Sequence, residues 1–276
     1  LARRRRRRCN ELARHLALAL ITFILVAPFY YVFLASLKNA TEIFSYPPKL
    51  LPFPPYFGNY EKLLFDTGFL RWMFNTLFVA GSVTVLKIFL DSMAGYALAK
   101  IDMTGKKIVF MAMLILLMVP IGALIVPLWS LMSSIGLIDT YAALILPPLA
   151  NPLGAILMRQ FILGLPKDLE NAARLDGVSE FGIYWRIVLP LSGPGLVTVA
   201  VLSFVASWNA YLLPLLLLGD PDMQTLPLGV QLFSTQYSQD NALVLAVTSL
   251  AMLPAILFFT IAQRNIIGGL TGAVKG

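Results

Sequence analysis

The sequence predicts an all-α integral membrane protein with six transmembrane helices, and three observations support this fold class. Of its 276 residues, 58% are apolar and only 13% are charged, about half the charged fraction that is usual in soluble domains. The mean hydropathy is +0.79. Six apolar segments are each long enough to cross about 30 Å of hydrocarbon, which takes roughly 20 helical residues. A soluble surface of this composition would aggregate, so lipid must cover much of the chain.

The six apolar segments divide the chain into a basic tail (1–15), a six-helix transmembrane domain (16–263) and a second tail (264–276). The first segment follows a run of arginines, as in a secretory signal peptide. It is too long for one and lacks a clear small-residue cleavage site, so we interpret it as a retained signal anchor. The segments run approximately Leu16–Leu37, Trp72–Ala97, Ile108–Met132, Tyr141–Leu163, Leu191–Leu218 and Ala242–Gln263.

Prolines within the third and fourth segments predict kinks, because proline removes a helical hydrogen bond. Kinked helices at mid-membrane often border cavities, although packing explains them equally well. The residues concerned are Pro120, Gly122 and Pro127 in the third segment and Pro147, Pro148 and Pro152 in the fourth.

The distribution of lysine and arginine orients the helices. Six arginines, Arg3 to Arg8, precede the first segment, whereas the connection from Gly219 to Asn241 carries no basic residue. The positive-inside rule therefore places both termini in the cytoplasm. The net charge of +7 could suggest a nucleic-acid partner. Because six of the basic residues form one run beside an apolar segment, we expect no nucleic acid.

The residue patterns of an enzyme are missing. Cys9 and His15 are the only residues of their types, and both lie in the basic tail. They provide no Ser/His/Asp set, no activated cysteine and no metal site, so we expect no catalytic residue and no metal. A phosphate-binding loop of the type G-x-x-x-x-G-K-[ST] is also missing, since Thr104–Lys107 lacks the upstream glycine. A transporter built on this chain would take its energy from an ion gradient or from another polypeptide.

Lys87 and Asp91 are the only oppositely charged pair inside a predicted span. Their i, i+4 spacing places them on one helical face. Three readings stay open: a structural ion pair, side chains that extend toward the interface, and a proton relay of an ion-coupled secondary carrier. A non-transporting subunit that helps a membrane complex to assemble is a further alternative.

The segment Leu169–Leu191 is charged although it lies between apolar spans. We predict a short helix with Asp168 as N-cap that ends at Gly177 in a left-handed conformation, then a second short helix capped by Ser179. One face of the first helix is predicted to carry Leu169, Ala172 and Ala173. Such a face suits docking into a groove of another protein, and an amphipathic loop on the membrane surface is the alternative.

This segment resembles the cytoplasmic EAA loop of ATP-binding-cassette (ABC) importer permeases. The loop has the pattern E-A-A, three residues, G, nine residues, I-x-L-P. The matching residues are Ala172, Ala173, Gly177, Ile187, Leu189 and Pro190. The glutamate of the motif is replaced by Asn171, with Glu170 immediately before it. Further stretches resemble the carbohydrate-uptake branch with its MalG-type subunits: Phe74–Thr76, Gly95–Lys100, Ser207–Tyr211 and Gly269–Gly276.

The resemblance implies a permease subunit that moves a sugar or related polyol across the cytoplasmic (inner) membrane of a bacterium or archaeon by alternating access. It implies a second permease subunit, two ATPase subunits that carry ATP and Mg, an extracytoplasmic solute-binding protein and surrounding membrane lipid, with no cofactor on this chain. Residues 165–190 would form the coupling loop, with ATPase contacts at Glu170, Asn171, Ala172, Ala173, Asp176, Gly177, Ile187, Leu189 and Pro190. In the C-terminal tail, Gly272 and Lys275 would also reach the ATPase.

Polar and aromatic residues inside the spans are candidates for the substrate pathway, because sugars bind through hydrogen bonds and aromatic stacking. The alternative is that these side chains join helices through buried hydrogen bonds. The candidates are Asn75, Asn151, Trp208, Asn209 and Tyr211. Apart from Arg159, which we assign to the cytoplasmic end of the fourth segment, Lys87 is the only basic group inside the spans, which favours a neutral sugar.

Overall fold

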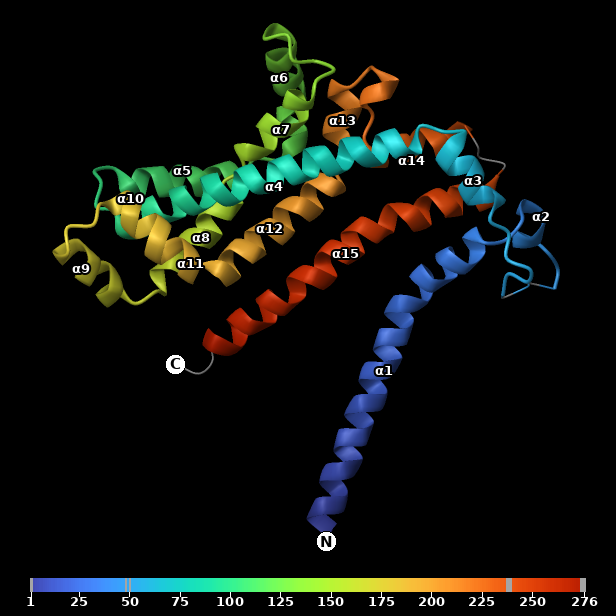
Figure 1. Ribbon diagram of the computed structural model, residues 1–276, viewed down its shortest axis with the longest axis horizontal. Coiled ribbons are helices and arrows are strands. Elements are labelled where there is room, and N and C mark those ends of the chain that lie inside the picture. Colours follow the sequence, from blue (N-terminus) through green and yellow to red (C-terminus); the bar gives the residue numbers. More distant parts are fainter. Residues whose placement is uncertain (1, 48, 50, 237–239, 274–276) are drawn as a thin grey trace. The chain divides into compact units, whose positions relative to one another are not determined.

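The computed structural model of the chain describes residues 2–47, 49, 51–236 and 240–273 (Figure 1). All regular structure in these residues is helical, so the predicted all-α class is confirmed. The chain forms two compact units. One comprises Leu1–Phe69 with Val230–Leu253, and the other comprises Leu70–Gly229 with Pro254–Gly276.

The first unit is held together by polar contacts at the end of its long N-terminal helix. Its helices are α1 (Ala2–Ser36), α2 (Ala40–Ile43), α3 (Gly58–Phe65) and the first part of α15 (Asn241–Ala273). The hydroxyl of Tyr60 on α3 lies 3.0 Å from that of Ser249 on α15 and also contacts Ser36. Asn59 donates 2.8 Å hydrogen bonds to the carbonyls of Ser36 and Lys38. The chain that leaves α1 is therefore fixed against α3.

The second unit contains the remaining helices, most of them shorter than a full span. They are α4 (Phe69–Lys100), α5 (Lys106–Met118), α6 (Ile121–Ser134), α7 (Tyr141–Leu149), α8 (Leu153–Leu163), α9 (Lys167–Leu175), α10 (Glu180–Ile183), the π-helix η1 (Tyr184–Val188), α11 (Leu189–Leu191), α12 (Gly193–Trp208), α13 (Leu212–Leu217), the 3-10 helix η2 (Pro221–Met223) and α14 (Leu226–Gln236). Helix α14 continues into the first unit.

Three candidate spans are continuous and three are broken. The continuous ones are Arg14–Ser36, Phe69–Lys100 and Asn241–Gln263. The broken ones are the pairs α5 with α6, α7 with α8, and the segment Glu180–Leu191 with α12, bent by 100°, 43° and 79°. With each bent pair counted as one span, the number of candidate spans reaches the six that the sequence predicts.

The breaks have local causes. Of the predicted kink residues, Pro120 precedes α6 and Pro152 precedes α8, at the two breaks. The others lie inside helices, Gly122 and Pro127 in α6 and Pro147 and Pro148 in α7.

The segment predicted as Leu191–Leu218 is not one helix, because α12 ends at Trp208 and α13 starts at Leu212. Pro214 has no N–H to bond the carbonyl four residues earlier, which favours a break before it.

Two apolar clusters stabilise the second unit. One joins α4, α8, α9, α10, η1 and α12 and consists of Tyr96, Met158, Ile162, Ala173, Ile183, Tyr184, Val188 and Val199. The other joins α4, α6, α7 and α13 and consists of Val79, Val83, Met132, Ala143, Leu144, Leu217 and Leu218. Helix α4 contributes to both clusters, so it connects the two ends of the unit.

The buried amide of Asn75 connects α4 to two other parts of the unit. It donates 2.8 Å hydrogen bonds to the carbonyls of Asp222 and Gln224 and accepts a 2.7 Å bond from the hydroxyl of Tyr141. We predict that Asn75→Ala lowers the free energy of unfolding by roughly 1 to 3 kcal/mol, since it removes the amide that donates to the carbonyls of Asp222 and Gln224 and the acceptor of the Tyr141 hydroxyl. Denaturant titration of the purified chain measures this. Ser134→Ala, which removes an exposed hydroxyl, is the control, and an equal effect of both variants would contradict the prediction.

Candidate functional site

The charged segment after α8 begins with helix α9. The predicted N-cap at Asp168 is wrong, because Pro166 occupies the N-cap position and α9 starts at Lys167. The backbone of Pro166 is not helical, with φ −58° and ψ 129°, and the helix begins at the next residue, Lys167. Asp168 and Glu170 lie instead in the first turn, where carboxylates favour the helix dipole.

Helix α9 ends in the turn that the sequence predicts. Gly177 has φ +76°, in the left-handed region. Its N–H donates to the carbonyl of Arg174 at 3.1 Å, and the N–H of Val178 donates to the carbonyl of Ala173 at 3.0 Å. This pair of bonds is a Schellman motif, which satisfies the last carbonyls of a helix. The predicted N-cap at Ser179 is confirmed, since its hydroxyl accepts a 3.2 Å bond from the N–H of Gly182.

The inner face of α9 is fixed by a buried ion pair. Glu170 is only 2% exposed, and its carboxylate lies 2.7 Å from Nζ of Lys100, the last residue of α4. Ala173 is buried on the same face, whereas Leu169 and Ala172 are exposed. The predicted common face of Leu169, Ala172 and Ala173 is therefore wrong. Because the Glu170 carboxylate faces Lys100, Ala173, three residues further along α9, faces inward as well.

Arg174 connects α9 to α10. Its Nε lies 2.7 Å from a carboxylate oxygen of Glu180, and the Tyr96 hydroxyl donates to the other oxygen at 2.6 Å. The hydrogen bond from Arg174 to Glu180 raises the pKa of the guanidinium and lowers the pKa of the Glu180 carboxyl group, which favours the charged form of both partners. A further bond of 3.3 Å runs from Arg174 to the amide oxygen of Asn171.

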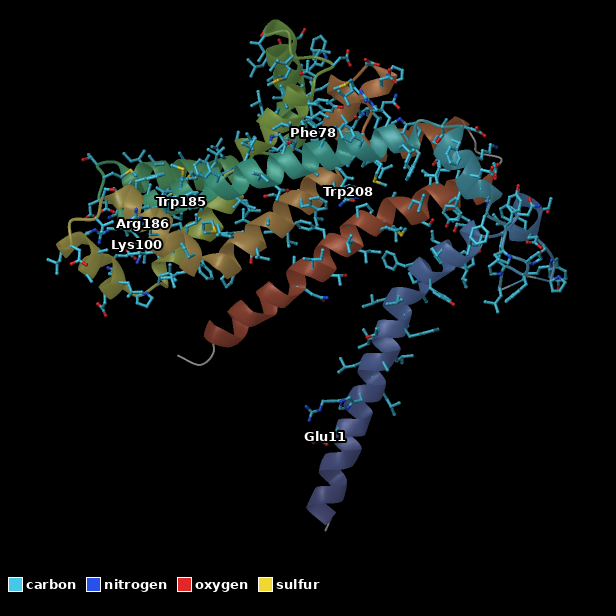
Figure 2. All side chains as sticks on the ribbon, viewed as in Figure 1. Glu11, Phe78, Lys100, Trp185, Arg186 and Trp208 are labelled. Carbon is cyan, nitrogen blue, oxygen red and sulfur yellow. The ribbon has the colours of Figure 1, made fainter. Side chains whose placement is uncertain are left out.

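Three side chains of α4 at successive i+4 positions contact three parts of this segment. Ser92 lies 2.8 Å from the hydroxyl of Tyr184, Tyr96 donates to Glu180, and Lys100 pairs with Glu170. Figure 2 shows Lys100 at the same end of α4 as Trp185 and Arg186. Since all three contacts come from one continuous helix, the segment is held to α4 along three turns.

The outer face of the segment is exposed and partly apolar. Leu175 is 90% exposed, and the stacked rings of Phe181 and Trp185 are also exposed. Of the residues predicted to contact an ATPase, those exposed are Asn171, Ala172, Asp176, Gly177 and Pro190, those half-buried are Ile187 and Leu189, and those buried are Glu170 and Ala173. Gly272 lies in the last turn of α15, and Lys275 lies outside the described residues.

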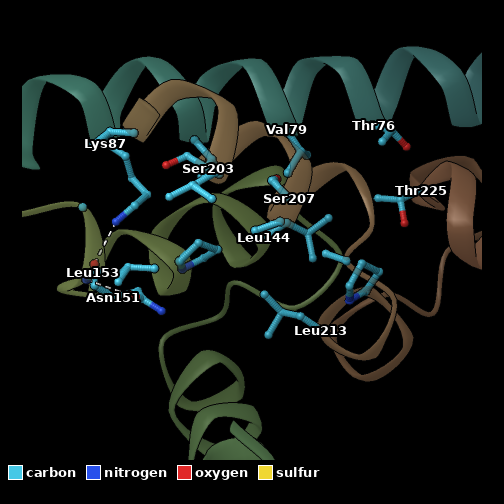
Figure 3. A pocket seen from close by; sticks show the side chains of 18 of the residues that line it. Thr76, Val79, Lys87, Leu144, Asn151, Leu153, Ser203, Ser207, Leu213 and Thr225 are labelled. Carbon is cyan, nitrogen blue, oxygen red and sulfur yellow. Dashed lines mark hydrogen bonds between the residues drawn. The ribbon is translucent and has the colours of Figure 1, made fainter. Parts of the chain in front are cut away.

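A cavity of about 170 Å³ lies in the same unit, bordered by α4, the break between α7 and α8, and α12 (Figure 3). Its polar lining consists of Thr76, Lys87, Asn151, Ser203, Ser207 and Thr225. The hydroxyl of Thr225 is buried and has no hydrogen-bond partner among the described residues. The cavity is otherwise apolar, so it offers a few polar atoms on an apolar wall, as small-molecule sites commonly do.

Of the five residues predicted for the substrate pathway, Asn151 lines this cavity. Asn75 uses its amide to join helices, as described above. Trp208 is buried and stacks on Phe204 with a ring separation of 5.6 Å. Asn209 bonds the Val205 carbonyl at 2.8 Å, and Tyr211 is 38% exposed.

Sequence reasoning did not find the small hydroxyl residues of the cavity. Ser203 and Ser207 lie in an apolar run, where a hydroxyl changes neither the hydropathy nor the period, and Thr225 lies in the polar connection before α14. Lys87 was noticed for its charge but not for its place at the wall. No group of three or more potential metal ligands lies together in the part of the chain that the structure describes.

The bent apolar spans, the polar cavity and the exposed charged segment together define a membrane permease. Residues 91–271 match the family described as "Binding-protein-dependent transport system inner membrane component". The chain is 38% identical to the arabinooligosaccharides transport system permease protein AraQ of Halalkalibacterium halodurans, over 94% of each chain. The chain therefore belongs to this family of ABC transport permeases, whose ATP is hydrolysed by separate ATPase subunits, and the predicted class of function is confirmed.

Two solved structures share the fold. A bacterial ABC transporter involved in the import of the acidic polysaccharide alginate matches with a TM-score of 0.80 at 23% identity, covering 93% of this chain and 96% of that one. A bacterial alginate ABC transporter in complex with its alginate pentasaccharide-bound periplasmic protein matches with a TM-score of 0.66 at 16% identity, covering 94% of both chains.

We predict that Glu170→Gln releases α9 from α4, because it leaves Lys100 buried without its counter-charge. Removing one partner of a buried ion pair typically costs roughly 3 to 5 kcal/mol. The expected results are a lower midpoint of thermal unfolding and faster trypsin cleavage after Lys167 and Arg174 in the solubilised full-length chain. Asp168→Asn, an exposed charge removed from the same helix, is the matched control. Indistinguishable cleavage of the two variants would show that the pair does not hold α9.

Proposed function

We propose that this chain is one of two permease subunits of an importer that carries a sugar or related polyol across a bacterial or archaeal cytoplasmic membrane. Alternating access would be driven by two separate ATPase subunits, and an extracytoplasmic solute-binding protein would deliver the substrate. The observation that carries the proposal is the segment 165–190, whose inner face is fixed to α4 while its outer face is exposed.

The division between the two faces is what a contact that transmits force requires. Polar contacts of Glu170, Arg174 and Glu180 fix the inner face, so a displacement of α9 moves α4 as well. The outer face offers Ala172 and Leu175 without a partner in the second unit as described. A groove on an ATPase subunit that accepts this face would move the spans as a rigid body when the ATPase dimer closes. In this proposal the segment 165–190 and both termini lie in the cytoplasm, on the side of the ATPase subunits.

The proposed cargo is a carbohydrate, and the cavity is the proposed part of its route within this subunit. The relative AraQ is named for arabinooligosaccharides and the structural neighbour for alginate. The cavity wall of this chain carries hydroxyls, an amide and one ammonium that is already paired, which suits an uncharged sugar. A periplasmic protein bound to the second neighbour supports a solute-binding protein as partner. ATP and Mg would be held by the ATPase subunits.

The deciding experiment measures ATP hydrolysis by the purified, reconstituted complex of this chain with its second permease subunit and ATPase subunits. A solute-binding protein loaded with members of a panel of sugars is added in turn. We expect hydrolysis to rise with one class of sugar and uptake to continue when an ionophore abolishes ion gradients at constant ATP. Uptake that stops with the gradient would replace the proposal by an ion-coupled carrier.

We predict that Gly177→Val abolishes uptake while the complex stays assembled. A β-branched residue at φ +76° is strained, so the turn between α9 and α10 must change its angle. Uptake and ATP hydrolysis by the complex are the measurements. Gly193→Val, at a glycine with open space around it and no positive φ, is the control. Normal uptake by Gly177→Val at normal expression would remove the segment from the coupling path.

A further inference from the structure

The break between α7 and α8 interrupts the backbone hydrogen bonds of the fourth span. In a continuous helix the carbonyl of Asn151 would accept from the N–H of Ala155, four residues on. Here that carbonyl accepts a 2.8 Å bond from Nζ of Lys87, which Figure 3 draws as a dashed line. The carboxylate of Asp91 lies at the N–H of Ala155, at the start of α8. The two groups of this missing helical bond therefore each face a charged side chain of α4.

These two side chains form a buried ion pair with a defined polarity. Nζ of Lys87 lies 3.0 Å from a carboxylate oxygen of Asp91, and the two side chains are 8% and 6% exposed. The cation lies at a free carbonyl of the break, and the anion lies at the N-terminus of α8, which has 11 residues. Each charge thus meets the partial charge of opposite sign at the helix ends. The structural ion pair predicted as one reading of the sequence is present.

The local sequence around the break is fitted to the carboxylate. A Cβ on Gly154 would overlap Oδ2 of Asp91, so only glycine leaves room for the carboxylate at this position. The side-chain oxygen of Asn151 accepts from the N–H of Leu153 at 3.0 Å, which satisfies another N–H at the start of α8.

The pair lies at the wall of the cavity. Lys87, Asn151 and Gly154 are all lining residues. Ser92, Tyr96 and Lys100 of α4 contact the segment 165–190, as described above. Helix α4 therefore contacts this segment through its last turns and the broken span through the turn before them.

We propose that Lys87 and Asp91 are positioning residues for transport: together they replace the missing backbone hydrogen bond of the broken span and fix its two halves to α4 at the cavity wall. The break then moves with α4, and the wall keeps its shape as the spans rotate. The role in transport rests on the proposed function, whereas the structural role does not depend on it.

The test uses the full-length chain in the solubilised complex, with Cys9→Ser and Ser203→Cys as the reporter of the cavity. Ser203 is buried and lines the cavity, so its modification by N-ethylmaleimide reports loosening of the wall. We expect Lys87→Met and Asp91→Asn each to raise the modification rate about tenfold. Lys87→Met leaves the Asp91 carboxylate and the Asn151 carbonyl unpaired, and Asp91→Asn leaves the buried Lys87 charge without its counter-charge. Lys87→Arg keeps the charge and should stay within about threefold.

The decisive variant exchanges the charges, Lys87→Asp with Asp91→Lys. It keeps an ion pair but brings a carboxylate to the Asn151 carbonyl and an ammonium to the Ala155 N–H. We expect this variant to be modified as fast as the single variants, about tenfold above the starting chain. A modification rate as slow as in the starting chain would show that any ion pair at these positions is sufficient, and it would overturn the proposal. Unchanged rates in Lys87→Met and Asp91→Asn would overturn it as well.

Gly154→Ala decides the question if the charge variants do not assemble. It keeps both charges but displaces the Asp91 carboxylate, so the same rise in rate is expected. Gly122→Ala, at a glycine with open space around it, and Lys49→Met, which breaks an exposed ion pair with Glu42, should leave the rate unchanged. An unchanged rate in Gly154→Ala would overturn the proposal. Since the modification needs neither ATP nor sugar, its outcome is independent of whether the chain transports a sugar.

Discussion

In hydrocarbon a backbone N–H or C=O that loses its helical partner has no water to bond instead, and this constraint governs where the chain places its charges. Three of the candidate spans are broken, and each break frees such groups. At the fourth span, Lys87 and Asp91 supply the missing partners. At the end of α4, Lys100 pairs with Glu170 and also donates to the carbonyl of Leu165 at 3.2 Å. Both of these cations belong to α4, a span that is itself unbroken.

Helix α4 joins the charged segment 165–190 to the broken fourth span. Its C-terminal turns contact this segment through Ser92, Tyr96 and Lys100, and the turns before them contact the fourth span. A helix of 32 residues with no break transmits a displacement along its axis with little loss. The short helices around it have fewer internal hydrogen bonds and take their position from α4. The continuity of one span therefore allows its neighbours to be broken.

The sequence predicts the features that depend on residues close together in the chain. Apolar length gives the six segments, the missing N–H of proline gives the kinks at Pro120 and Pro152, and the conformational freedom of Gly177 gives the turn after α9. It could not predict which residues of α9 face inward, because that depends on Lys100, which lies on another helix. Likewise, Asn75 was a pathway candidate on its polarity alone. Only the fold shows that the amide of Asn75 is already hydrogen-bonded to three groups from two other segments.

The asparagine at position 171 is explained by the charges around it. Arg174 already contacts Glu180 at 2.7 Å and lies 3.8 Å from Glu170. A carboxylate at position 171 would be a third anion competing for the same guanidinium. The amide of Asn171 instead accepts one bond from Arg174 without adding charge, and it leaves the pairing of Arg174 with Glu180 intact. Glu170 holds the segment to its own subunit, so position 171 is free to present a neutral, polar group on the outer face.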